Sequence, residues 1–281
     1  MKSKDLYNNI SRELQNVYDP PEAQSMAIIL LEEYFELKRS DLLLDRDADT
    51  NAELDLKLLQ AVNRIKNHEP IQYVLGKAHF YGRDFKVDYN VLIPRRETEE
   101  LVHLIINENP NFRGSILDIG TGSGCIPITL DLEIPQSSVA SIDISEGALG
   151  IAKRNANELK ADIEFHQFDI LSSDALPNQY DIIVSNPPYV TTTEKKLMRD
   201  NVLNHEPHLA LFVADDDPLL FYNVIIKKAT DALKQGGRLY FEINEQFGEE
   251  LADRMKEYGF RNVIITKDMQ GKDRIVSGSI I

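Results

Sequence analysis

The stretch Ser115-Ile116-Leu117-Asp118-Ile119-Gly120-Thr121-Gly122-Ser123-Gly124 decides how this chain is interpreted. Its apolar beginning predicts a buried strand over 115–119, and the glycines that follow predict a tight turn into a helix. A strand, a Gly-rich turn and a helix in this order let the backbone approach a nucleotide cofactor. The third glycine comes one residue earlier than in the dinucleotide fingerprint, so the spacing is not the usual one for NAD or FAD. A plain tight turn between strand and helix is the alternative.

Strands and helices alternate around this turn. Besides 115–119, we expect strands at 139–142, 163–165, 180–185, 238–243, 260–266 and 274–279, and helices at 97–107, 148–159, 218–234 and 247–258. This alternation predicts an α/β domain with a mainly parallel sheet. Upstream, apolar residues spaced by three or four predict amphipathic helices over 6–17, 23–34 and 54–65, which form a small bundle. Residues 71–93 are aromatic and β-branched with Gly breaks, which suggests a hairpin.

Acidic residues stand where three strands of the predicted sheet end. Asp118 precedes the Gly-rich turn, where it would repel a pyrophosphate but could hold a cationic or hydroxyl-bearing ligand. Asp143 suits both ribose hydroxyls of an adenosine, although an acid there also suits a helix N-cap region. Asp169 can accept from the exocyclic amine of adenine, or it is an ordinary surface charge. Together with the Gly-rich turn, Asp143 favours ribose binding.

The most specific motif is Asn186-Pro187-Pro188-Tyr189, which directly follows the strand predicted at 180–185. The two prolines remove two backbone donors and stiffen the turn. What remains is rich in acceptors, namely the Asn186 amide oxygen and the Pro187 carbonyl, and Tyr189 adds a flat aromatic face. A planar amino group with two N–H donors would satisfy both acceptors. The motif therefore predicts a site for a planar nitrogen nucleophile; the alternative is a rigid loop.

Composition narrows the classes of function. The chain has 281 residues and a formal net charge of −15, and such an acidic surface opposes general binding to phosphate backbones. One cysteine, Cys125, excludes an intramolecular disulfide and a cysteine-rich metal cluster, and the six histidines show no metal-ligand spacing. We see no signal peptide and no bilayer-length apolar run, so we expect a soluble cytoplasmic protein without a metal.

The set formed by 118–124, Asp143 and 186–189 resembles the class I S-adenosylmethionine-dependent amino-methyltransferases. Further motifs narrow the resemblance to the HemK/PrmC family of release-factor glutamine methyltransferases. These motifs are Glu69–Gly76, Phe80–Gly82, Phe85–Val87, Val91–Glu99, His205–Leu211 and Gly271–Arg274. Arg96 departs from the proline usual in that family, and Ile170 stands where an aromatic residue often does.

This resemblance implies a Rossmann-like α/β methyltransferase fold with a mainly parallel seven-stranded sheet and a small N-terminal helical bundle. The implied domains are a substrate-recognition domain over 1–70, a β-hairpin linker over 71–95 and a methyltransferase domain over 96–281. The implied cofactor is S-adenosyl-L-methionine, with S-adenosyl-L-homocysteine as product. The implied substrate is the glutamine of the Gly-Gly-Gln motif in class 1 peptide chain release factors, and we expect a monomer.

The resemblance also assigns roles to residues. Cofactor binding falls to Asp118, Gly120, Thr121, Gly122, Ser123, Gly124, Asp143, Asp169, Ile170 and Asn186. Catalysis falls to Asn186, Pro187 and Tyr189, and substrate binding to these three with Pro188.

Three other functions share much of this pattern. An adenine-nitrogen methyltransferase of DNA or RNA could share 186–189, but the negative charge and the lack of a Lys/Arg-rich arm argue against it. A non-catalytic binding protein on the same scaffold would be favoured by a broken nucleophile motif, and the motif is intact. A methyltransferase of a ribosomal-protein glutamine would have almost the same site, so the sequence separates it least well.

Overall fold

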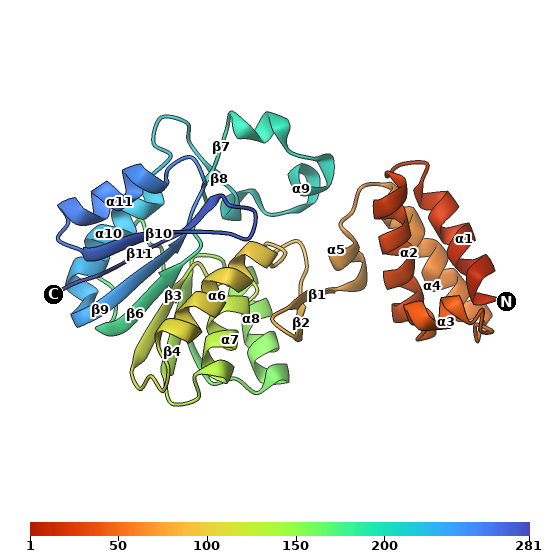
Figure 1. The fold of residues 1–281 in the computed structure, drawn as a ribbon, viewed down its shortest axis with the longest axis horizontal. Helices are drawn as coiled ribbons and strands as arrows, with labels where there is room; N and C mark the ends of the chain where they lie inside the picture. Colours follow the sequence, from red (N-terminus) through yellow and green to blue (C-terminus); the bar gives the residue numbers. More distant parts are fainter. The chain divides into compact units, whose positions relative to one another are not determined.

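The computed structural model describes residues 1–281 apart from the side chain of Leu197, and it divides into two compact units. The smaller unit comprises Met1–Gly76 together with Asp200–His205. Its helices are α1 (Ser3–Leu14), α2 (Pro20–Phe35), α3 (Arg39–Leu43), α4 (Ala52–Lys66), α5 (Ile71–Leu75) and α9 (Asp200–His205). Apolar side chains of α1, α2 and α4 form one core, as their spacing predicted. Figure 1 shows these three helices side by side.

Local signals set the ends of these helices. Asp19 caps α2 by accepting a hydrogen bond from Glu22 N at 3.0 Å, and two prolines occupy the first turn, where no backbone donor is needed. Asn51 caps α4 in the same way through Leu54 N at 2.9 Å. Short α3 was not foreseen from the sequence.

The hairpin expected over 71–93 is wrong in its first residues. Residues 71–75 form α5, which belongs to the smaller unit and ends at Gly76 with a φ of 70°. The hairpin itself is confined to β1 (Lys77–Phe80) and β2 (Arg83–Lys86). Phe80 and Phe85 contact edge to face and are buried in a core of the larger unit, so the hairpin is packed into that unit.

The larger unit contains a seven-stranded sheet in the order β10-β11-β9-β6-β3-β4-β5. The strands are β3 (Ser115–Ile119), β4 (Ser138–Asp143), β5 (Ile163–Gln167), β6 (Tyr180–Ser185), β9 (Leu233–Glu242), β10 (Arg261–Lys267) and β11 (Asp273–Ser279). The first five strands are parallel, and β11 runs antiparallel to both of its neighbours. The fold is therefore the predicted one, a class I methyltransferase sheet.

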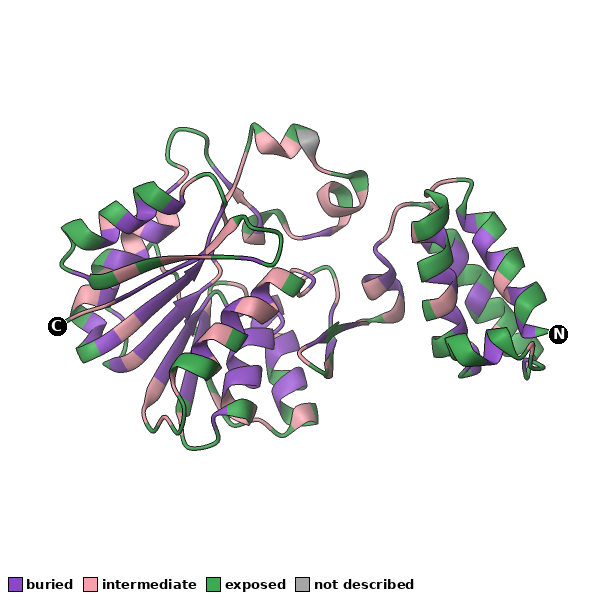
Figure 2. Ribbon diagram, in the orientation of Figure 1, coloured by how far each residue is buried: buried purple, intermediate pink, exposed green. Residues whose placement is uncertain are grey.

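Helices cover both faces of this sheet (Figure 1). The helices α6 (Arg96–Glu108), α7 (Cys125–Glu133) and α8 (Glu146–Leu159) share one core with the sheet. The helices α10 (Leu220–Ala232) and α11 (Gly248–Glu257) share the other. Because neighbouring strand residues point to opposite faces, the central strands are buried along almost their whole length (Figure 2).

Between β6 and α10 the chain forms short elements that the sequence pattern did not indicate. They are β7 (Val190–Thr191), the 3₁₀ helix η1 (Glu194–Leu197), α9, the 3₁₀ helix η2 (His208–Ala210) and β8 (Phe212–Val213). Among the described residues, no helix is long and apolar enough to cross a membrane.

Candidate active site

The register of the parallel strands brings the predicted site residues to one edge of the sheet. Ile119 of β3 lies opposite Ile142 of β4 and opposite Ser185 of β6. The residues that follow, Gly120, Asp143 and Asn186, therefore leave the sheet side by side. This carboxyl edge is where open parallel sheets bind ligands.

The Gly-rich turn is held by the carboxylate of Asp143. One oxygen of Asp143 accepts from Gly122 N at 2.9 Å, and the other accepts from Ser145 N at 2.9 Å. Burial raises the pKa of the Asp143 carboxyl, against the opposing effect of these N–H donors. Each carboxylate oxygen has a second lone pair, so Asp143 can anchor the turn and still accept from two ribose hydroxyls.

Asp118 and Gly124 support the Gly-rich turn without lining the cavity at this edge of the sheet. Asp118 is fully buried and accepts from Ser141 Oγ at 2.6 Å, and burial raises its pKa to about 7. Because Ser141 donates to Asp118, its oxygen is left to accept from the buried hydroxyl of Thr121. Gly124 begins α7 with a φ of 82°, and a Cβ there would lie 2.8 Å from Ile128 Cδ1.

A cavity of about 210 Å³ opens at this edge of the sheet. Among the predicted site residues, it is lined by Gly120, Thr121, Gly122, Ser123, Asp143, Asp169, Ile170, Asn186, Pro187 and Pro188. Apolar side chains of Leu92, Phe168, Ile170 and Ala148 contribute walls suited to a flat purine. A carboxylate for ribose, a Gly-rich turn and an apolar slot together fit an adenosine cofactor.

The residues expected to face adenine were only partly predicted from the sequence, as Asp169 and Phe168 show. Asp169 lines the cavity, and its Oδ1 accepts from Leu171 N at 2.9 Å. The aromatic residue missing after this acid is present just before it, since Phe168 also lines the cavity. Phe168 N donates to the backbone carbonyl of Asp143 at 3.0 Å, which ties the chain at Phe168 to the end of β4.

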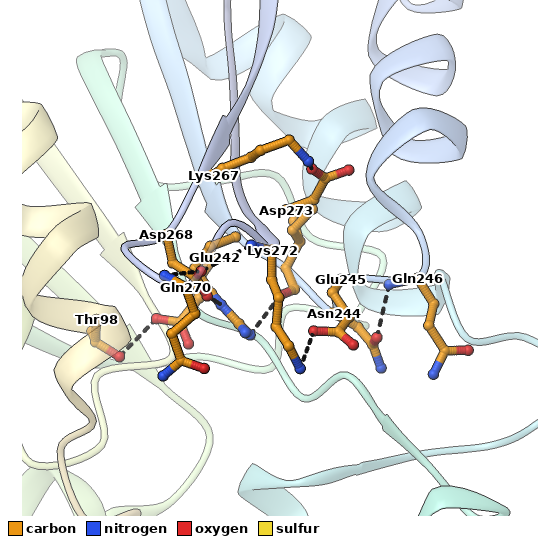
Figure 3. Close-up of polar contacts among 12 residues, drawn as sticks. Thr98, Glu242, Asn244, Glu245, Gln246, Lys267, Asp268, Gln270, Lys272 and Asp273 are labelled. Atoms are coloured by element: carbon orange, nitrogen blue, oxygen red, sulfur yellow. Dashed lines mark hydrogen bonds and ion pairs between the residues drawn. The ribbon is translucent and has the colours of Figure 1, made fainter.

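The Asn-Pro-Pro-Tyr loop is fixed by a polar network that the sequence did not reveal. Asn186 Nδ2 donates to Thr98 Oγ1 at 3.3 Å. Thr98 Oγ1 in turn donates to Glu242 Oε2 at 2.7 Å (Figure 3). The hydroxyl of Tyr189 donates to Glu242 Oε1 at 3.2 Å. Tyr189 does not line the cavity, and its ring packs against the core under α10.

Asn244, two residues after Glu242, holds the Tyr189 end of the Asn-Pro-Pro-Tyr loop. Its Nδ2 donates to the Tyr189 carbonyl at 3.3 Å and to Glu194 Oε1 at 3.0 Å. Asn244 Oδ1 in turn accepts from Gln246 N at 3.1 Å (Figure 3). The backbone after Tyr189 is therefore anchored as firmly as its side chain.

An ion pair between half-buried Arg95 and buried Glu206 joins the motifs Val91–Glu99 and His205–Leu211. Glu206 is 4% exposed and accepts from Arg95 at 2.6 Å and from Ile93 N at 3.2 Å. Two further basic residues nearby in the sequence are also paired, Arg83 with Glu133 and Lys86 with Glu158. The positive charges of Arg83, Lys86 and Arg95 are therefore neutralised within the chain.

Cys125 and the candidate metal ligands among the described residues form no second reactive site. Cys125 lines the cavity, but burial raises the pKa of its thiol to about 12, so it stays protonated. Within the described residues, no group of three or more His, Cys, Asp or Glu is placed to hold a metal ion.

A mainly parallel sheet of this order, with a Gly-rich turn, the carboxylate of Asp143 and an Asn-Pro-Pro-Tyr loop at one edge, defines a class I S-adenosylmethionine-dependent methyltransferase. The methyl donor of this class is S-adenosyl-L-methionine, as the sequence predicted. A family model described as methyltransferase small domain matches residues 98–209. A methyltransferase from Pyrococcus furiosus shares the fold, with a TM-score of 0.54 and 15% identity over 82% of this chain and 98% of that one.

Close relatives identify the family. A release factor glutamine methyltransferase of Bacteroides thetaiotaomicron is 45% identical over 96% of this chain and 97% of its own length. The protein of the same name from Flavobacterium psychrophilum is 44% identical over 98% of both chains. A model described as PrmC N-terminal domain matches residues 5–76. The chain belongs to the release factor glutamine methyltransferase family, which confirms the resemblance.

Proposed function

We propose that this chain methylates the side-chain amide nitrogen of the glutamine in the Gly-Gly-Gln motif of class 1 peptide chain release factors. The observation that carries the proposal is the orientation of Asn186. Its amide nitrogen is turned to Thr98, which leaves the Oδ1 atom as an acceptor beside the cofactor cavity. An acceptor there suits a primary amide, which brings two N–H donors.

The residues that would hold the cofactor are those of the cavity. Asp143 would accept from the ribose hydroxyls, and Phe168, Ile170 and Leu92 would enclose the adenine, with Asp169 at its polar edge. Bound S-adenosylmethionine supplies a methyl group on a positively charged sulfur. Gly120 suits this point of the site because its φ is 87°, a backbone conformation that side-chain-bearing residues rarely adopt.

Catalysis in this proposal is mainly positioning. A glutamine amide is a weak nucleophile because its lone pair is delocalised into the carbonyl. Asn186 and the Pro187 carbonyl hold its N–H groups and aim the nitrogen at the methyl carbon for an in-line displacement. The new N–C bond forms as the C–S bond breaks, its electron pair goes to sulfur, and one proton leaves the nitrogen for solvent.

The partner and setting are part of the proposal. The helical unit that contains Met1–Gly76 recognises the release factor, the unit that begins at Lys77 carries out methyl transfer, and the chain acts as a cytoplasmic monomer without a nucleic-acid ligand. The net charge of −15 supports the last point.

The test is transfer of labelled methyl from S-adenosylmethionine to purified, unmodified release factor. The same release factor with its Gly-Gly-Gln glutamine changed to alanine is the matched control, and DNA, ribosomal RNA and ribosomal protein are tested in parallel. Label confined to the intact release factor supports the proposal. Label on nucleic acid or ribosomal protein instead would show that the site was assigned correctly and its substrate wrongly.

A further inference from the structure

A buried carboxylate lies next to the Asn-Pro-Pro-Tyr loop in the sheet. Ser185 of β6 is opposite Phe241 of β9, so the following residues, Asn186 and Glu242, leave the two strands at the same level. Glu242 is 1% exposed and does not line the cavity. It therefore lies beside the nucleophile site without being able to touch a bound substrate.

Both carboxyl oxygens of Glu242 act as acceptors, Oε2 toward Thr98 and Oε1 toward Tyr189. Thr98 Oγ1 is therefore the donor in its 2.7 Å hydrogen bond to Glu242 Oε2 (Figure 3). With its single hydrogen committed, Thr98 can only accept from Asn186, whose Nδ2 lies 3.3 Å away. The Asn186 amide is thus fixed with nitrogen toward Thr98 and oxygen toward the substrate.

The second oxygen of Glu242 acts on the other end of the loop. Oε1 accepts from the Tyr189 hydroxyl at 3.2 Å, which fixes the rotation of the tyrosine side chain. Tyr222 holds this end of β9 as well, because its hydroxyl donates to the Glu242 carbonyl at 3.1 Å. One buried side chain therefore contacts both arms of the loop, one through Thr98 and one directly.

We propose that Glu242 is a positioning residue for the methyl-transfer reaction, which sets the amide orientation of Asn186 through Thr98 and the ring of Tyr189 through its hydroxyl. This inference rests on the proposed function, because it assigns the origin of the acceptor that receives the substrate amide. In the opposite orientation, Asn186 would present a donor to the N–H groups of glutamine. The substrate would then be repelled where it should be aligned.

The direct test replaces Glu242 by glutamine, which keeps the shape but brings a donor. We expect kcat for release-factor methylation to fall by about tenfold or more, since small errors of alignment can cost about 100-fold. We expect the Kd for S-adenosylmethionine to stay within about threefold of the wild-type value, because Glu242 lies outside the cavity. A wild-type kcat in Glu242→Gln overturns the proposal, as does a loss confined to cofactor affinity.

The matched control is Glu108→Gln. Like Glu242, Glu108 is a carboxylate that accepts a hydrogen bond from a tyrosine. Glu108 is on α6, and Tyr240 Oη of β9 donates to it at 2.8 Å. Both pairs join α6 to β9, but Glu108 is at the other end of the helix from Thr98. Glu108→Gln should keep the wild-type kcat, and an equal loss in both variants would overturn a specific role for Glu242.

Thr98 supplies a second test in case Glu242→Gln does not fold. Thr98→Val keeps the shape and removes the hydroxyl, whereas Thr98→Ser keeps the hydroxyl and removes a methyl group. Thr98→Val should lose kcat as Glu242→Gln does, and Thr98→Ser should retain most of it. Equal kcat values in these two variants contradict the proposal.

A structural readout separates this inference from the proposed function. The side-chain N–H₂ resonances of Asn186, assigned by their loss in Asn186→Asp, should shift and exchange faster in Glu242→Gln and Thr98→Val than in wild type or Glu108→Gln. Unchanged resonances overturn the positioning role whatever the substrate is. If the resonances respond but wild-type protein leaves the release factor unlabelled, the proposed substrate fails and the positioning role of Glu242 stands.

Discussion

Asn186→Ala tests the nucleophile site most directly. The substitution removes the acceptor that faces the substrate and the amide nitrogen that donates to Thr98 at 3.3 Å. It leaves Asp143 and the apolar walls of the cavity in place. The expected result is a selective loss of methyl transfer with cofactor binding largely intact.

The size of the loss follows from what the amide does. Removing one preorganised polar group aimed at the reacting atoms costs about 10²–10³-fold in kcat, or about 2.7–4 kcal/mol of transition-state stabilisation. The Kd for S-adenosylmethionine should change by less than about threefold, because Asn186 is one of many lining residues and its proposed role is to hold the nucleophile.

The assay is a single turnover with saturating S-adenosylmethionine and release factor, alongside calorimetric titration of the cofactor. Asn157→Ala is the control, since Asn157 is exposed on α8 and away from the cavity lining. Near-normal turnover in Asn186→Ala would refute the assigned nucleophile geometry. A parallel loss of cofactor affinity and turnover would show that Asn186 acts on the cofactor instead.

Three further substitutions test other parts of the site. Asp143→Ala should weaken S-adenosylmethionine binding by about 100-fold or more in calorimetry, because hydrogen bonds to a charged group contribute about 1.5–3 kcal/mol each; it should also lower the ligand-free Tm, because two backbone N–H groups lose their acceptor. Asp118 binds its proton up to about pH 7 when folded but releases it nearer pH 4 when unfolded, so stability should fall by up to about 4 kcal/mol as the pH rises through that window. Urea unfolding at pH 5 and 8 samples the part of this window above pH 5, so it should show a fall of about 3 kcal/mol in wild type and none in Asp118→Asn. Gly124→Ala should destabilise the fold by about 1–3 kcal/mol in thermal unfolding, because its φ is 82° and the new Cβ meets Ile128.

The sequence predicted those elements whose structure depends on residues close together in the chain. Parallel strands are continuous apolar runs because both of their faces are covered, so 115–119 and 180–185 were predicted with the bounds the structure has. The segment 71–75 misled because Tyr73 and Val74 favour strands. Pro70 before it and Gly76 after it instead confine the segment to a single helical stretch. Tyr73 and Val74 are buried from this helix and not from a strand.

The polar support of the site could not be predicted in the same way. Thr98 and Glu242 are 144 residues apart in the chain, and Arg95 and Glu206 are 111 apart. Nothing in the local pattern of either partner indicates the other, because the pairing depends on how helix α6 packs against the sheet. Glu242 lies at the end of a strand, so its role emerges only once the register of β6 and β9 is known.

Asp143 and Glu242 suggest how this site uses its carboxylates. Each ends a parallel strand, and burial raises the pKa of each. Each side chain also accepts two hydrogen bonds from the protein, Asp143 from Gly122 and Ser145. Glu242 accepts from Thr98 of α6 and from Tyr189 of the Asn-Pro-Pro-Tyr loop. A base needs a free lone pair aimed at the proton it removes, and Glu242 is screened from the cavity by Thr98. Because the leaving sulfur is already positively charged, the reaction needs alignment more than proton removal. These acids are therefore best understood as anchors, one fixing where the cofactor is held and the other how the nitrogen is aimed.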